Sequence, residues 1–375
     1  MSLSAADGAR VGVRLSPMQE RFHLDGPLLL ALAALAIFGL AVLYSAFGED
    51  LEQVQQQVLR LSAGFLALIA FAQLPPRTLY RLAPWVFAGG LLLLAAVMGI
   101  GAMGQGAQRW IDLGFMRFQP SELMKLALPL ALAWLLVQGE LPPRWPRVLI
   151  ATALILVPTA LIALQPDLGT AVLVGLSGVF VLFLAGLRWR WIVGAIAGIA
   201  AMAPAVWFFV MHDYQRARVL TFLNPESDPL GAGYHIIQSK IAIGSGGLFG
   251  KGWLNGTQAH LEFIPERHTD FVLAVIAEEF GLIGVAQLLL VYLFVAGRGL
   301  WIAIQAQDPF GRLMAATISL TFFTYVVVNA GMVSGLLPVV GLPLPLISFG
   351  GSSLVTIMAA FGILMAIHTH RRLWS

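Results

Sequence analysis

The chain has 375 residues, of which 59% are hydrophobic and only 11% are charged. Soluble domains carry about 25% charged residues, so this composition excludes a soluble protein and indicates an integral membrane protein. The chain has no cysteine, which excludes disulfides, thiolate metal sites and a cysteine nucleophile. The formal net charge of +3 is small and by itself says little about partners.

Apolar runs long enough to cross a membrane as helices follow one another along the chain. The sequence predicts ten of them, at 27–47, 55–74, 82–101, 119–138, 147–164, 168–187, 191–211, 270–296, 313–336 and 349–368. The first run is too long for the apolar core of a signal peptide and lacks a cleavage motif, so we expect a retained helix. The predicted fold class is therefore an all-α integral membrane protein.

Arginines in the connections between the runs indicate the orientation. With the N-terminus inside, the inner segments hold thirteen arginines and the short outer connections hold two. The thirteen are Arg10, Arg14, Arg21, Arg77, Arg81, Arg144, Arg147, Arg188, Arg190, Arg298, Arg312, Arg371 and Arg372, and the two are Arg109 and Arg117. Both termini are thus predicted to be cytoplasmic, with 212–268 as a large extracellular loop between helices seven and eight. The predicted divisions are a cytoplasmic segment (1–26), a ten-helix membrane domain (27–370) and a tail (371–375).

Polar residues collect at four helix ends that this orientation places in the outer leaflet. They are Arg109 and Trp110 with Glu122 and Lys125, then Asp167, then Asp270, and finally ISFGGSS (347–353) with Ser348 and Ser352. We expect helix packing to bring them around one outward-open cavity, where charges within a membrane are tolerated. Each also has a purely structural interpretation. Glu122 and Lys125 can neutralise one another, Asp167 can cap its helix, and the prolines and glycines of 342–353 can set a tight re-entrant connection.

The stretch HLEFIPERHTDFVLAVIAEEFGLIG (260–284) holds three of the most informative acidic residues. A carboxylate within a membrane-length apolar run costs about 2.5 kcal/mol or more, so it is usually retained for a reason. Asp270 can satisfy the free amides at a helix start, but Thr269 can fill that position and leave the aspartate free. Glu278 and Glu279 are adjacent and point about 100° apart on a helix, so they cannot share one site. We interpret both as structural or supporting.

Three other motifs in the loop fail as sites. GSGGLFGKG (244–252) lacks the first glycine of a phosphate-binding loop and has Gly252 where that loop needs Ser or Thr. Asn255-Gly256-Thr257 matches a glycosylation acceptor, a pattern that arises often by chance. A further group has residue types that bind metals, but its spacing fits no standard metal site. That group is His260, Glu262, Glu266 and His268.

Taken together, the motifs resemble the SEDS family (shape, elongation, division and sporulation). GAQRWIDLG (106–114) with QPSELMK (119–125), QPDLGTA (165–171), GTQAHLEFIPERHTDF (256–271) with AEEFG, and PLISFGGSS (345–353) occur in the family's order. The resemblance spans about residues 25–370. The lead-in GWLNGTQAHLEF and the short termini resemble the elongation branch of the family more than its division branch.

The resemblance implies a ten-helix peptidoglycan glycosyltransferase that polymerises lipid II at the outer face of the bacterial cytoplasmic membrane during cell elongation. The essential aspartate of the family matches Asp270. Its other conserved positions match Arg109, Trp110, Glu122, Lys125 and Asp167. The resemblance also implies a partner, a class B penicillin-binding protein that cross-links the glycan.

The resulting hypothesis has Asp270 as the general base that activates the C4 hydroxyl of the acceptor GlcNAc. Attack on C1 of the donor MurNAc then gives a β-1,4 link and releases undecaprenyl pyrophosphate. Arg109 and Lys125, with a divalent cation (Mg²⁺ or Mn²⁺) as a candidate cofactor, would stabilise the leaving group. Arg216, Arg218, Lys240 and Arg267 of the loop are weaker candidates. The full set expected to bind substrate is Arg109, Trp110, Glu122, Lys125, Asp167, Arg267, His268, Thr269, Ser348 and Ser352.

Three alternatives remain open from the sequence. A lipid II flippase would also need many helices and carboxylates within the membrane, although the crowding of polar motifs in one leaflet favours surface chemistry. A scaffold that only holds a penicillin-binding protein leaves the carboxylates unexplained. A division or sporulation paralogue of the same family is the third alternative.

Overall fold

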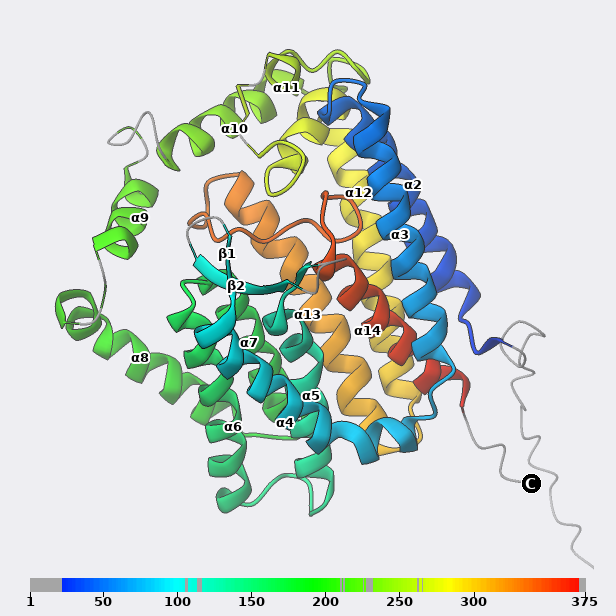
Figure 1. Cartoon of the computed structure of the whole chain (residues 1–375), viewed down its shortest axis with the longest axis vertical. Helices are drawn as coiled ribbons and strands as arrows, with labels where there is room; N and C mark the ends of the chain where they lie inside the picture. Colours follow the sequence, from blue (N-terminus) through cyan, green and yellow to red (C-terminus); the bar gives the residue numbers. More distant parts are fainter. Residues whose placement is uncertain are drawn as a thin grey trace, which may run out of the picture.

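The structure, a computed structural model, describes residues 22–370 apart from 105–106, 113–116, 210, 212, 225, 227–231, 262 and 265. The described part is mostly helical (Figure 1). Its long helices are α2 (Gly26–Ala46), α3 (Leu51–Ala72), α4 (Pro76–Ile100), α5 (Pro120–Val137), α6 (Trp145–Leu164), α7 (Leu168–Leu184), α8 (Trp189–Phe209), α12 (Val272–Gln305), α13 (Pro309–Val333) and α14 (Ser352–Thr369). Three helices occupy the predicted loop, namely α9 (Asp213–Leu223), α10 (Ala232–Gly246) and α11 (Thr257–His260).

Each predicted apolar run overlaps one long helix. Within the described residues, eight of these helices are long and apolar enough to cross a membrane. The other two, α7 and the part of α8 over Trp189–Ala205, are apolar but shorter. The chain is therefore a multi-pass membrane protein, as its composition indicates.

A small antiparallel sheet corrects the all-α prediction. β1 (Ala102–Gly104), β2 (Ala107–Asp112) and β3 (Arg117–Phe118) lie between α4 and α5 and pair in chain order. Such strands are too short to show a clear alternation of polar and apolar residues, which is the usual sequence signal for a strand. The sheet places Arg109 and Trp110 over the ends of the neighbouring helices.

Helix α12 continues to Gln305, past the predicted end at 296, and differs from a straight helix over 270–296 in two further respects. It begins at Val272, which leaves Asp270 in the preceding turn, and it is broken at Gly281, where φ is 65° and ψ is −167°. A Cβ on Gly281 would lie 2.3 Å from the backbone nitrogen of Gly250, so glycine is required for the close approach of that loop. Glu278 and Glu279 therefore lie in the turn of α12 that directly precedes this break.

The connection between α13 and α14 is irregular and runs through the interior of the bundle (Figure 1). Leu342, Leu344 and Ile347 are buried there. The backbone passes so close to α2 that a Cβ on Gly39 would lie 2.8 Å from the Leu346 carbonyl oxygen. Non-helical backbone at this depth is tolerated because the protein itself buries it.

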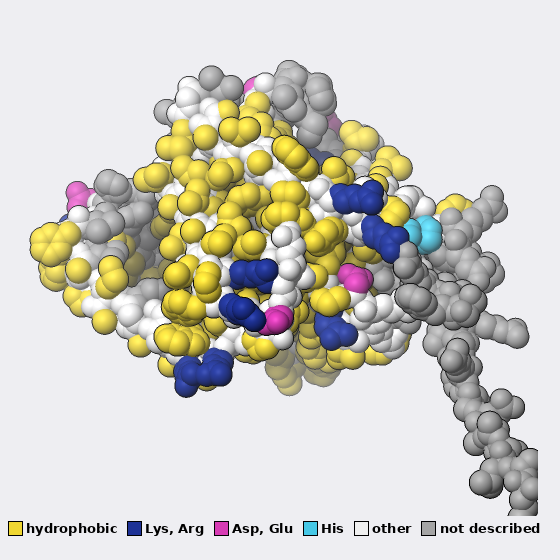
Figure 2. Space-filling view, turned by 90° about the horizontal axis from the view of Figure 1, so that it is seen from below, with side chains coloured by type: hydrophobic (Ala, Val, Ile, Leu, Met, Phe, Trp, Pro, Cys, Tyr) yellow, Lys and Arg dark blue, Asp and Glu magenta, His cyan; other side chains and the backbone are white. Residues whose placement is uncertain are grey.

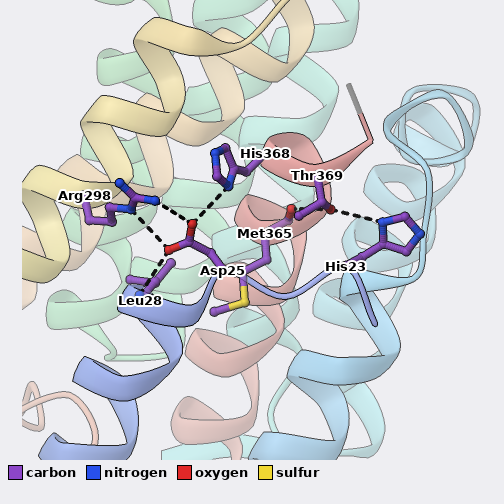
Figure 3. A network of polar contacts seen from close by, with 7 residues as sticks. All are labelled: His23, Asp25, Leu28, Arg298, Met365, His368 and Thr369. Atoms are coloured by element: carbon purple, nitrogen blue, oxygen red, sulfur yellow. Dashed lines mark hydrogen bonds and ion pairs between the residues drawn. The ribbon is translucent and has the colours of Figure 1, made fainter. Parts of the chain in front are cut away.

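The two ends of the membrane domain meet in a polar network that joins α2, α12 and α14 (Figure 3). Asp25 caps α2 through a hydrogen bond from the Leu28 amide, and its carboxylate accepts from Arg298 at 2.7 and 3.2 Å. His368 Nδ1 lies 3.0 Å from the same carboxylate. Burial alone would raise the pKa of Asp25, but the hydrogen bonds from His368, Arg298 and Leu28 together hold that pKa well below its usual range.

Candidate functional site

The turn before α12 carries Asp270 at the edge of the interior. The Thr269 and Phe271 amides both donate to the Glu266 carbonyl, which closes the turn. The side chain of Asp270 is half-buried. Among the described residues, none donates a hydrogen bond to its carboxylate.

The backbone of this turn is held from α13. Asn329, which is fully buried, donates from Nδ2 to the Asp270 carbonyl oxygen at 2.9 Å and to the Leu342 carbonyl oxygen at 2.7 Å. The neighbouring Gly341 has φ of 70°, and a Cβ there would lie 3.4 Å from Asp270 Oδ2. Thus one amide side chain fixes the turn that bears Asp270 against the connection that faces its carboxylate.

The turn is also held from the connection that leads into α14. Ser348 Oγ donates to the Thr269 carbonyl oxygen at 2.5 Å and accepts from the Leu344 amide at 2.7 Å. The Phe349 amide donates to the His268 carbonyl oxygen at 2.7 Å. The hydroxyl of Ser348, a residue expected to bind substrate, is therefore engaged in positioning the backbone beside Asp270.

The electrostatics of the turn favour a base that works near neutral pH. Burial raises the pKa of Asp270, and the nearby charge of Glu266 raises it further, to about 6. Burial and Arg267 lower the pKa of His268, although Glu266 opposes them. At pH 7 Asp270 is thus mostly ionised while the neighbouring imidazole is neutral, a state in which a carboxylate can accept a proton.

A second polar cluster joins the sheet to the starts of α5 and α7. Arg109 donates from Nε to the Gln165 carbonyl oxygen at 2.9 Å and from Nη2 to that of Pro166 at 2.5 Å. Gln119 donates to Asp167 Oδ2 at 2.9 Å, while Asp167 Oδ1 accepts from the Thr170 amide at 3.2 Å. Asp167 does cap its helix, and it also ties α7 to the start of α5.

The pair Glu122 and Lys125 lies inside the bundle. Lys125 Nζ is 2.7 Å from Glu122 Oε1, and each side chain is only 6% exposed. The ammonium also lies 5.1 Å from the centre of the Tyr325 ring on α13. Glu122 therefore offsets the charge of Lys125 at this position, as the structural interpretation of the motif predicts.

Two relationships connect these clusters into one site. Tyr325 beside Lys125 and Asn329 beside Asp270 are four residues apart on α13, so they lie on consecutive turns of one face, about 6 Å apart. At α7, a Cβ on Gly169 would lie 2.3 Å from the Val340 carbonyl oxygen, next to the Gly341 that faces Asp270. The clusters near Asp167, Lys125 and Asp270 are thus linked through one face of α13 and through the connection between α13 and α14.

Glu278 and Glu279 have partners outside the Asp270 turn. Glu278 Oε1 accepts from Lys251 Nζ at 2.7 Å, from the Gln258 amide at 3.0 Å and from Thr257 Oγ1 at 3.1 Å. Glu279 accepts from Ser45 near the end of α2. Both carboxylates fasten α12 to the loop or to α2, contacts that agree with a supporting role.

The remaining predicted residues have contacts of their own or are known by their burial. Arg267 donates from Nε to the Ala46 carbonyl oxygen at 2.6 Å. The His268 ring packs near Phe47 and Phe349. Trp110 on β2 and Ser352 at the start of α14 are both half-buried.

The loop group with metal-binding residue types is only partly described, since Glu262 and the side chain of His260 lie outside the described residues. Within the described part, no three His, Asp or Glu side chains gather as metal ligands. Of the weaker loop candidates, Arg216 donates to the Trp207 and Phe208 carbonyls, Lys240 is exposed, and the side chain of Arg218 lies outside the described part.

Sequence reasoning missed the contribution of α3. Gln57 is fully buried and donates to the Ser348 carbonyl oxygen at 3.3 Å, and the Arg60 guanidinium lies 4.0 Å from the centre of the Phe349 ring. A signal was available, because Arg60 is an arginine within an apolar run, and such residues usually mark function. Asn329 carries a weaker signal of the same kind.

Comparison with known proteins gives one family. The family model for FtsW, RodA and SpoVE, described as "Cell cycle protein", matches residues 27–373. Peptidoglycan glycosyltransferase MrdB of Escherichia coli strain K12 is 55% identical over 356 residues, which cover 95% of this chain and 96% of that protein. Probable peptidoglycan glycosyltransferase FtsW of Geobacter metallireducens is 38% identical, with 95% and 97% covered.

Solved structures agree with this. The rod shape determining protein RodA of Thermus thermophilus superposes with a TM-score of 0.70 at 34% identity, covering 92% of this chain and 96% of that one. A chain described under "Structural coordination of polymerization and crosslinking by a peptidoglycan synthase complex" superposes with a TM-score of 0.81 at 37% identity, with 93% and 99% covered.

Proposed function

This chain belongs to the FtsW, RodA and SpoVE family, and we propose that it is a peptidoglycan glycosyltransferase in which Asp270 is the general base. One observation carries the assignment of the base. The carboxylate of Asp270 lies in a turn fixed from α13 and from the connection before α14, without a hydrogen-bond donor among the described residues, and its pKa is raised to about 6. A carboxylate of this kind is ionised at neutral pH yet basic enough to take a proton.

The proposed substrate is lipid II. Asp270 accepts the proton of the acceptor C4 hydroxyl as the oxygen attacks C1 of the donor sugar, and the C1–oxygen bond to undecaprenyl pyrophosphate breaks. Attack from the face opposite the leaving group inverts the donor carbon and gives a β-1,4 link. The products are a glycan longer by one disaccharide and undecaprenyl pyrophosphate.

Cations near the site would stabilise the departing pyrophosphate. Lys125 is a weak candidate because Glu122 already offsets its charge. Arg109 is stronger, because it bonds only to neutral carbonyls and no carboxylate among the described residues pairs with it. Arg60 is a second candidate at the Phe349 side of the site. Lys125 and Glu122 are then assigned to shaping the site, together with Asp167.

A divalent cation would add a Lewis acid at the pyrophosphate. Magnesium and manganese prefer oxygen ligands and often bind through one or two carboxylates and the substrate phosphates. The exposed carboxylate of Glu266, beside Asp270, is the residue that would hold such an ion. The Glu266 carboxylate accepts a hydrogen bond from Thr269 at 2.8 Å. It keeps further oxygen lone pairs that a metal ion could use.

This function requires a topology of ten membrane-spanning helices in the bacterial cytoplasmic membrane. Both termini would then be cytoplasmic and Asp270 would face outward. The arginine asymmetry supports this topology. Figure 2 views the end of the bundle opposite α11, where Lys and Arg side chains are set among hydrophobic ones. The loop over 212–268 would then be extracellular, on the same side as Asp270.

A class B penicillin-binding protein is the proposed partner. An apolar groove of about 990 Å³ runs between α10, α12 and α13. Its lining includes the small residues Gly244, Ala277, Ala330 and Gly331, which let another transmembrane helix approach closely. We assign this groove to the partner's membrane helix.

Polymerisation by purified protein tests the function. Detergent-solubilised protein given lipid II should make glycan chains although there is no membrane to cross. The same reaction is run with a chelator to test the metal. A flippase or a scaffold would make none. Loss of product on chelation would establish the metal requirement, and an unchanged rate would remove the cation from the mechanism.

A further inference from the structure

A cavity of about 650 Å³ lies at the far end of the bundle from Asp270. It is bounded by the start of α4, the end of α5, the start of α13 and His370. Asn329, which holds the Asp270 turn, is about 30 Å away along α13 from Pro309 in the cavity wall, at 1.5 Å per residue. The cavity is thus separate from the glycosyltransferase site.

The cavity carries unpaired positive charge. Arg77 and Arg81 are exposed and lie one turn apart on α4, and no carboxylate in the described part of the chain forms an ion pair with either. Like charges at this spacing repel one another. Among the described residues that line the cavity, the one acidic residue is Asp308, whose carboxylate caps α13 through a 2.7 Å hydrogen bond from the Gly311 amide. An anion between the two arginines would relieve their repulsion.

The floor and the outer margin of the cavity are apolar. Tyr80 packs edge-on against Phe310, with ring centres 5.4 Å apart. Beyond Arg81 along α4, Trp85 is 76% exposed and Leu92 is 72% exposed. Positions 77, 81, 85 and 92 recur at helical spacing on one face of α4. A membrane lipid placed there would meet two cations first, then an interfacial tryptophan, then aliphatic surface.

We propose that this cavity binds the phosphate headgroup of an anionic phospholipid of the cytoplasmic leaflet, with an acyl chain along the Trp85 face of α4. Basic pockets between transmembrane helices on the cytoplasmic side suit such headgroups. The choice of leaflet rests on the orientation proposed above, whereas the lipid site itself does not depend on glycosyltransferase activity.

Native mass spectrometry of the full chain in detergent tests the site, with dioleoyl phosphatidylglycerol and dioleoyl phosphatidylcholine as probes. The wild-type protein should retain phosphatidylglycerol in preference to phosphatidylcholine. The Arg77→Gln/Arg81→Gln protein should bind phosphatidylglycerol roughly 30-fold more weakly, at about 1 kcal/mol for each arginine. Arg77→Lys/Arg81→Lys should keep most of the preference, because it keeps both charges.

Arg188→Gln/Arg190→Gln is the matched control, since both arginines are exposed at the same end but lie outside the cavity. It should bind phosphatidylglycerol like the wild type. Equal binding of the two lipids by the wild type would overturn the proposal, as would a loss in the control equal to that in the cavity variant. Displacement of the lipid by sn-glycerol 3-phosphate alone would overturn the lipid assignment in favour of a soluble phosphate ligand.

Discussion

The side-chain amide of Asn329 donates to the backbone carbonyl of Asp270 at 2.9 Å. The same nitrogen donates to Leu342 at 2.7 Å, so one buried residue of α13 joins the turn before α12 to the connection before α14. Neither segment has regular secondary structure at this point, and both lie inside a membrane domain. The position of the proposed base therefore depends on a buried residue whose side-chain nitrogen is committed to two backbone carbonyls.

Replacing Asn329 by Ala should lower turnover more than it lowers protein yield. The change leaves two buried carbonyls without a donor, at about 1–3 kcal/mol each, and frees the Asp270 turn. Ser319→Ala is the control, because Ser319 is buried on the same helix but bonds only to the Ala315 carbonyl of its own helix. The polymerisation rate per amount of folded protein separates an effect on turnover from an effect on yield. Equal rates for Asn329→Ala and Ser319→Ala would show that Asn329 does not position Asp270.

The rate of polymerisation should rise with pH through about 6. Asp270 acts as a base only when it is ionised, and its pKa is raised from 3.8 to about 6. The rate at pH 5 should thus be about one tenth of that at pH 7.5. Initial rates from pH 4.5 to 8 measure this profile. A rate that stays flat down to pH 4.5 would contradict a general base with a pKa near 6.

Glu266→Gln should move that profile to lower pH. Burial is the larger cause of the raised pKa of Asp270, and the charge of Glu266 is the second, so removing this charge lowers the pKa. Glu266→Asp keeps the charge and should leave the profile nearer to that of the wild type. The position of the midpoint, not the maximal rate, is the readout, and an unmoved midpoint would contradict the assigned cause.

Glu278 and Lys251 should behave as a structural pair. Glu278 is fully buried and accepts three hydrogen bonds, so Glu278→Ala should lower the free energy of unfolding by about 3 kcal/mol. Adding Lys251→Ala should cost little more, because its partner is already gone. Thermal unfolding in detergent measures both. Glu140→Ala, which breaks an exposed pair with Arg144, should cause no measurable change. Additive losses for Glu278 and Lys251 would mean that the pair is not coupled.

The helices and the proposed base were accessible from the sequence because their signals are local. An apolar run of membrane length has few alternatives to a helix, and each predicted run overlaps one. Asp270 stood out because it follows a polar loop and opens an apolar run within a recognisable motif. The i, i+3 spacing of Glu122 and Lys125 predicted their ion pair in the same way.

Features that depend on distant contacts were not accessible. The break in α12 at Gly281 exists because the loop near Gly250 packs against it, and a single glycine in an apolar run does not reveal that contact. In TYVVVNAGMV (324–333), Asn329 is one polar residue in an apolar helix, and its two partners come from elsewhere in the chain. The hydrogen bond from Gln57 to the Ser348 carbonyl likewise depends on the packing of α3 against α14, which the sequence does not show.

The role of Asp270 as the base is tested by the rate at which purified Asp270→Asn protein polymerises lipid II in detergent. Because burial already disfavours the charged carboxylate, the amide should not lower the thermal stability of the fold. Asp213→Asn, at an exposed aspartate of α9, is the control and should polymerise normally. We expect the Asp270→Asn protein to be folded but slower than the wild type by about 100-fold or more. A folded Asp270→Asn protein that makes glycan at a near-normal rate would contradict the role of Asp270 as the base.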